Sequence, residues 1–226
     1  MSLLKFEKKS TYGGWGYKGQ FRTYPAVATK ASSVIIDLEN NRFYSGKSIG
    51  ANADYYNESW PRFTRAAGLL TTADAIEIFV RFQLFAQNSS NSYILFGAND
   101  GYGVEGNMSV DFSGTTHTIS FMTTGSSGWA SPTWMGIVDE SITYENLSTS
   151  SHTVMISKPA NSTEFTMTYD KQLSTTANFT TMVTGGGNRY LTLGGIYNNR
   201  DSISNGLGYI YMDSYIKYNG KYLDEL

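Results

Sequence analysis

The chain has 226 residues, contains no cysteine, and carries 17 basic and 19 acidic side chains, which gives a formal net charge of −2. This length is common for a single all-β domain. The lack of cysteine excludes a disulfide scaffold, a thiolate zinc site and a cysteine nucleophile. Because the basic residues are scattered rather than gathered in a stripe, we expect no nucleic-acid partner.

The sequence also predicts no membrane span, because no apolar run approaches the roughly 20 residues that a membrane helix needs. The first residues lack the basic, apolar and small-residue order of a signal peptide. We therefore expect the chain to be produced in the cytoplasm and either to stay inside the cell or to leave it within a larger particle or by lysis.

Composition favours β structure. Aromatic residues make up 15% of the chain and charged residues 16%. Tyr, Phe and Thr suit a pleated, half-buried surface, whereas Gly and Asn suit tight turns. The sequence therefore predicts an all-β protein with very little helix.

Residues 1–30 are interpreted as an N-terminal arm or as an edge segment of the same domain. The stretch from Gly13 to Gly19 reads as a loop rich in aromatic residues, and Trp15 is the candidate contact if this segment docks on a neighbour. Further on, residues 63–72 contain helix formers for only one or two turns.

The clearest predicted strand runs from Ile76 to Phe85, where apolar residues occupy every even position and should face the core. Residues 108–112 and 117–121 show the same period and predict a hairpin. A second hairpin is predicted from residues 153–157 and 165–169, joined by a polar turn.

The last part of the chain predicts a closing strand. A short strand pattern at Leu191 and Leu193 ends at a glycine pair. A long strand is then predicted from Gly208 to Tyr218, and Asn219-Gly220 is a strong signal for a tight turn after it.

The order of these features resembles the concanavalin A-like lectin/glucanase superfamily in its laminin-G-like branch. The early core strand at 75–82, the central hairpin at 151–156 and 165–170, the glycine pair in 191–195 and the closing strand at 208–223 carry the resemblance. It implies an antiparallel β-sandwich, or jelly roll, over residues 31–226. The closing strand is similar to versions found in bacteriophage tail and capsid-surface proteins.

Catalysis has little support in the sequence, and we expect no enzymatic activity. Asp37 with Glu39, and Asp139 and Glu140 with Glu145, are the closest acid clusters, but none has the spacing of a paired-carboxylate hydrolase.

Metal and phosphate chemistry have equally little support. His117 and His152 lack partners at zinc-ligand spacing. The glycine triplet at 185–187 is not followed by the lysine of a phosphate loop.

A binding role has better support. Trp129 and Trp134 fall in a segment read as a long polar loop, where an indole offers a flat apolar face to a sugar ring. The alternative is that both tryptophans fold back over a sandwich edge or face a subunit. Asn99, Asp100 and Tyr102 form a second candidate contact for a ligand or calcium, or else a plain Asp-Gly turn. No cofactor is expected, because no calcium-ligand set is recognisable.

The closing strand offers a further candidate surface. Tyr209, Tyr211 and Tyr215 lie on one face, either as an exposed recognition surface or buried against another layer or subunit. Together with Trp15 they form the predicted interface.

These observations lead to one principal functional expectation. We expect a non-catalytic adhesion module on a virion surface, in a tail fibre, receptor-binding protein or capsid decoration, that recognises cell-surface glycan. Other virion proteins are the second class of partner, and a homo-oligomer is expected. The alternatives are a purely structural interaction protein and, more remotely, a glycoside hydrolase.

Overall fold

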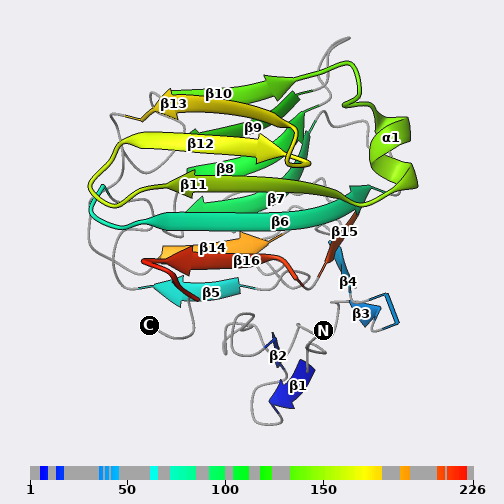
Figure 1. Cartoon of the computed structure of the whole chain (residues 1–226). Helices are drawn as coiled ribbons and strands as arrows, with labels where there is room; N and C mark the ends of the chain where they lie inside the picture. The colour runs from blue at the N-terminus through cyan, green and yellow to red at the C-terminus, as the bar shows by residue number, and fades with distance from the viewer. Residues whose placement is uncertain are drawn as a thin grey trace.

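The computed structural model of the chain describes residues 6–9, 14–17, 36–37, 39–40, 42–45, 62–65, 72–84, 92–99, 104–111, 118–123, 133–179, 189–193, 208–211 and 213–222. Within these ranges the protein is an antiparallel β-sandwich of two facing sheets with one short helix (Figure 1). The fold class predicted from the sequence is therefore confirmed.

The smaller of the two facing sheets has six strands in the order β10-β9-β8-β7-β14-β5. Its strands are β5 (Arg62–Arg65), β7 (Ser92–Asn99), β8 (Val104–Asp111), β9 (Thr118–Thr123), β10 (Thr133–Val138) and β14 (Arg189–Leu193). The predicted hairpin of residues 108–121 is confirmed as β8 and β9, in which Val110 faces Ile119. Part of the stretch with weak helical character, 63–65, is strand instead, because β5 pairs with β14.

The larger sheet has nine strands and includes the central hairpin and the closing segment. Its strands are β3 (Ile36–Asp37), β4 (Arg42–Ser45), β6 (Ile76–Leu84), β11 (His152–Lys158), β12 (Glu164–Tyr169), β13 (Leu173–Asn178), β15 (Gly208–Tyr211), β16 (Tyr215–Tyr218) and β17 (Lys221–Tyr222). Strands β1 (Phe6–Lys9) and β2 (Gly14–Tyr17) form a two-stranded sheet, and no other strand in the described part of the chain pairs with them. A boundary at residue 30 stays a prediction.

Strand β6 lies at the centre of the larger sheet and confirms the predicted alternation. Its even-numbered side chains from Ile76 to Leu84 are buried, while the odd-numbered ones are half-buried on the outer face. Between the sheets, Phe121 of β9, Phe165 of β12 and Phe179 form a ring cluster with centroid distances of 5.0–5.6 Å. This cluster joins the two sheets, since its rings come from both.

The predicted long strand from Gly208 to Tyr218 is two strands. Phe82 of β6 pairs with Ile210, and Phe79 pairs with Tyr215, so three steps along β6 match five steps along the closing segment. The two extra residues form a bulge, and because two residues are one full pleat, Ile210 and Ile216 still face the core. Met212 lies outside the described residues.

A buried serine replaces part of the strand ladder at this bulge. The Oγ atom of Ser214 accepts a hydrogen bond from the Arg81 backbone N–H at 3.0 Å and donates to the Arg81 carbonyl oxygen at 3.4 Å. Ser214 is fully buried. Its hydroxyl therefore satisfies backbone groups of β6 that would otherwise face a gap in the ladder.

The other turns follow from local chemistry. Asn219 and Gly220 have φ angles of 49° and 79°, as the predicted tight turn between β16 and β17 requires. Asp170 and Lys171 also have positive φ, at 48° and 60°, and form the turn between β12 and β13 without a glycine. The sequence did not predict strand β13.

Helix α1 (Tyr144–Thr149) was not predicted either, and it lies at the end of the sandwich between β10 and β11 (Figure 1). Thr143 caps it by accepting a hydrogen bond from the Asn146 N–H, and Leu147 anchors it in the core. Among the residues described, no helix has the length and apolar character that crossing a membrane requires.

We expect Ser214→Ala to lower the free energy of unfolding by about 1–3 kcal/mol, because Arg81 loses its partners in a buried environment. Chemical denaturation measures this. The matched control is Ser174→Ala on the exposed side of β13, which should change stability by less than about 0.5 kcal/mol. Equal effects of the two substitutions would contradict the role given to Ser214.

Candidate functional site

The two loops singled out in the sequence leave the six-stranded sheet at the same edge. Asn99, at the end of β7, pairs with Val104 at the start of β8, and Thr123, at the end of β9, pairs with Thr133 at the start of β10. Since Thr123 also pairs with Gly106 of β8, segments 100–103 and 124–132 begin at one end of the sheet.

The loop residues themselves are not described. Asp100, Tyr102 and Trp129 lie outside the described residues, and Asn99 and Trp15 are placed only as strand positions. Between β7 and β10 lie two strands, which separates Asn99 from Trp134 by about 14 Å or more across the sheet. A shared ligand site for these residues stays a prediction.

Trp134 is not in a loop, as the sequence suggested, but in the edge strand β10. It pairs with Met122 of β9, and its side chain points to the outer face with 49% of its surface exposed. The run of Gly, Ser and Pro before it hid the start of this strand. Because Met135 and Ile137 point into the core, the alternation forces Trp134 outward.

On the outer face of β10, the position next to this indole is a glycine, Gly136. Gly136 and Val138 share the face with Trp134, and Val138 is 59% exposed. A Cβ atom on Gly136 would come within 2.9 Å of the Thr118 methyl carbon, so the close approach of β9 favours glycine here. The strand thus presents an indole and an isopropyl group about 14 Å apart, and the Thr118 methyl of β9 lies against the backbone of Gly136 between them.

The three tyrosines of the closing segment share the outer face of the larger sheet, as predicted. Each is half-buried under a cation. The Arg42 guanidinium lies 3.6 Å from the Tyr209 ring centroid, Arg81 lies 4.3 Å from that of Tyr211, and the Lys217 ammonium lies 4.4 Å from that of Tyr215. The cations therefore cover these rings, which leaves less ring surface for a sugar. Whether the face is a subunit interface is untested.

Polar contacts hold these side chains in place on the outer face of the larger sheet. The side-chain oxygen Oε1 of Gln83 accepts hydrogen bonds from Tyr211 Oη at 2.9 Å and from Arg42 Nη1 at 3.2 Å. Its amide nitrogen donates to the Ser148 carbonyl oxygen at 2.8 Å, which attaches α1 to β6. The Phe79 ring stacks on Tyr215 with centroids 5.2 Å apart.

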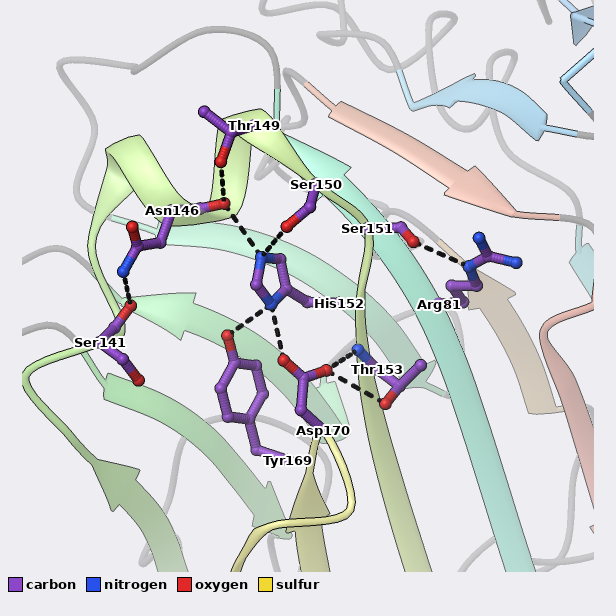
Figure 2. A network of polar contacts seen from close by, with 10 residues as sticks. All are labelled: Arg81, Ser141, Asn146, Thr149, Ser150, Ser151, His152, Thr153, Tyr169 and Asp170. Atoms are coloured by element: carbon purple, nitrogen blue, oxygen red, sulfur yellow. Dashed lines mark hydrogen bonds and ion pairs between the residues drawn. The ribbon is translucent and has the colours of Figure 1, made fainter.

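A second constellation surrounds His152 at the start of β11 (Figure 2). Its Nδ1 atom lies 2.7 Å from Asp170 Oδ2 and 2.8 Å from Tyr169 Oη, while Nε2 lies 3.1 Å from Ser150 Oγ. Asp170 Oδ1 in turn accepts hydrogen bonds from the Thr153 N–H and hydroxyl. The order serine, histidine, aspartate has the connectivity of a hydrolytic triad.

The surroundings of Nε2 nevertheless oppose catalysis. The Asn146 carbonyl oxygen lies 3.0 Å from Nε2 and can only accept, so this nitrogen must carry a hydrogen to satisfy the contact. A general base needs the lone pair of Nε2 directed at the serine instead. The carbonyl end of α1 also points here, and its negative dipole would disfavour an oxyanion.

The geometry instead makes His152 a tie between α1 and the β12–β13 turn. When both ring nitrogens carry hydrogen, one donates to Asn146 and the other to the Asp170 carboxylate. The ring stacks on Tyr169 at 5.7 Å. The pKa of the Tyr169 hydroxyl is raised, first by burial and then by the negative charge of Asp170, so its proton stays in the network.

The remaining acids act locally. Asp139 accepts a hydrogen bond from the Ser141 N–H at 2.9 Å, and hydrogen bonding by the Ser141 hydroxyl and backbone lowers the pKa of Asp139. It holds the turn that leads into α1, whose first turn contains Glu145. Asp37 is paired opposite Arg42 in the β3–β4 ladder. In the part of the chain that is described, no three His, Cys, Asp or Glu residues gather in a way that could hold a metal ion.

Comparison with solved structures finds other proteins with a similar course of the chain. The CBM2 module of the Lactobacillus casei BL23 phage J-1 evolved Dit is 10% identical over 84% of this chain and 80% of that one, with a TM-score of 0.47. The Ruminococcus gnavus IT-sialidase CBM40, bound to α2,3 sialyllactose, is 9% identical over 72% and 95%, with a TM-score of 0.48. The alginate lyase from Alteromonas sp. 272 is 6% identical over 70% and 78%, with a TM-score of 0.43.

No family model matches the sequence, and no curated protein matches it either. Likeness to solved structures at this level carries no conclusion about the ligands or residues of this chain. The laminin-G-like branch stays a prediction.

We expect Asp170→Asn to destabilise the protein by about 1–3 kcal/mol, because the amide cannot accept from Thr153 and His152 as the carboxylate does. Asparagine tolerates the positive φ of this position, so the backbone is not the cause of the loss. The control is Asp213→Asn, which affects an exposed ion pair and should cost less than about 1 kcal/mol. Thermal and chemical unfolding compare the two variants. A smaller loss of stability for Asp170→Asn than for Asp213→Asn would contradict the proposed role of His152 and Asp170 in linking α1 to the β12–β13 turn.

Proposed function

We propose that this chain is a non-catalytic module that binds glycans. The observation that carries the proposal is Trp134, a half-exposed indole on the edge strand β10. It lies near the end of the sheet at which segments 100–103 and 124–132 begin. Indole rings bind the C–H faces of sugar rings, while neighbouring polar side chains take the hydroxyl groups.

The rigidity of β10 supports this role. Six residues of the strand pair with β9, and Met135 and Ile137 anchor it in the core, so the indole is held by the sheet rather than by a loop. A platform fixed in advance loses little conformational entropy when a ligand binds.

We expect Trp134→Ala to weaken binding to the glycan recognised on a host-surface glycan array by about tenfold or more, because a central aromatic contact is lost. The matched control is Val138→Ala, which removes an exposed apolar group from the same face of the same strand. Wild-type binding by the alanine variant at Trp134 would contradict the proposal. If that variant instead fails to oligomerise while glycan binding is unaffected, the structural role is favoured.

We further propose that the module is displayed on a virion surface, in a tail fibre, a receptor-binding protein or a capsid decoration. The resemblance of the closing strand to phage surface proteins supports this proposal. The segment concerned forms β15, which pairs with β4 and β6, β16, which pairs with β6, and β17, which pairs with β16.

Immunogold labelling and sedimentation of particles test this location. We expect the chain to sediment with intact virions and gold particles to decorate their outer surface. The control is an antibody against a protein of the virion interior, which should label only disrupted particles. A chain that stays in the supernatant, with no label on particles, would overturn the virion assignment and leave the glycan proposal to its own test.

A further inference from the structure

Arg81 is held in a defined position on the outer face of the larger sheet, opposite the face that carries Trp134. Its Nε atom donates to Ser151 Oγ at 3.0 Å, its Nη1 atom lies 3.3 Å from Asp213 Oδ2, and its guanidinium covers the Tyr211 ring. The position of Ser151 beside this guanidinium is visible in Figure 2. The bulge at Ser214 fixes the backbone of Arg81 as well.

One edge of this guanidinium is available to a ligand. Among the described residues, none accepts a hydrogen bond from Nη2, and the Arg81 side chain is 38% exposed. Nη2 shares the side edge of the guanidinium with Nε, which is the edge used in two-point recognition of carboxylates. Asp213 contacts Nη1, on the other side of the group.

Ser151 completes this edge as a second donor. Its oxygen accepts from Nε of Arg81, so its own hydrogen is directed elsewhere, and no described residue accepts it. The Nη2–H group and the Ser151 hydroxyl therefore lie next to each other as two donors. A carboxylate can accept from both, one with each oxygen.

The neighbouring surface suits a sugar. The outward positions of β12 and β13 beyond β11 carry hydroxyl and amide side chains, namely Thr166, Thr168, Ser174, Thr176 and Asn178. The acid of β12, Glu164, lies at the far end of these strands from Arg81, since β11 pairs Thr153 with Arg81 and Lys158 with Ile76. Next to the oriented guanidinium of Arg81, the outward positions of β12 and β13 between Thr166 and Asn178 thus carry neutral polar groups.

We infer that Arg81 and Ser151 form a binding subsite for the carboxylate of an acidic sugar, with the glycan chain lying across β11, β12 and β13. The subsite is separate from the proposed contact at Trp134, because the two lie on opposite faces of the sandwich. It adds a substrate class, uronic-acid glycans, that the indole platform alone does not select.

NMR titration of the full chain with a short galacturonate oligomer tests the inference. We expect the Arg81 Nε–H resonance to shift on titration, and the methyl-esterified oligomer, which has the same rings without the charge, to leave it unchanged. Affinity should fall as the salt concentration rises, because the contact is ionic and partly exposed. Equal binding of the esterified oligomer, or no shift with either oligomer, would overturn the inference.

Variants distinguish two-point recognition of the carboxylate by Arg81 and Ser151 from simple attraction to a positive charge. Arg81→Gln and Arg81→Lys should each weaken binding by about tenfold or more, since lysine keeps the charge but lacks the two-point geometry. Ser151→Ala, which keeps Arg81 itself intact, should also weaken binding. Lys217→Gln is the matched control, because this cation lies on the same face and is paired with Glu77.

Two further outcomes decide the assignment. Trp134→Ala should leave galacturonate binding unchanged, so that failure of the indole site and failure of this subsite are distinguishable. An acidic peptide that binds as tightly as the oligomer would overturn the assignment to sugars. Retention of full affinity in both Arg81→Gln and Ser151→Ala would overturn the subsite.

Discussion

Strand β6 buries five even-numbered apolar side chains, from Ile76 to Leu84, between the two sheets. Burial of side chains of this size contributes about 1.5–3 kcal/mol each, or about 8–15 kcal/mol in total. That total is comparable with the whole stability of a typical domain, about 5–15 kcal/mol. A slip of one residue would turn all five outward, so the register is fixed, and Arg81 and Gln83 must lie on the outer face.

The bulge in the closing segment shows how this constraint extends to the partner strands. A one-residue insertion between β15 and β16 would have turned Ile216 out of the core, whereas two residues preserve the facing. The insertion leaves Arg81 beside a gap in the ladder, and the Ser214 hydroxyl fills it. The same bulge brings Asp213 against Nη1 of Arg81. A device that preserves core packing therefore also orients a surface cation.

The parts of this fold that could be predicted are those written as local patterns, such as the alternation in β6 and the Asn219-Gly220 turn. The β12–β13 hairpin escaped prediction because Asp170 and Lys171 adopt positive φ without a glycine to mark the turn. Contacts between distant positions leave no local signal: Arg81 meets Ser151 and Asp213 at separations of 70 and 132 residues. Sequence reasoning found Trp134 as a residue but not its strand, since turn-forming residues precede it.

The shapes of the two proposed contacts bear on how such a module would act. Trp134 and Arg81 both lie on sheet surfaces and keep about half or more than a third of their side-chain surface exposed to water, so each contact is shallow and individually weak. Because Trp134 and Arg81 lie on opposite faces of the sandwich, they cannot both contact the same sugar unit. Tight attachment to a surface then requires several copies of the module acting together, because linked weak sites gain affinity without any new contact. Display of a shallow, rigid module in many copies on a particle, as proposed above, would meet that requirement.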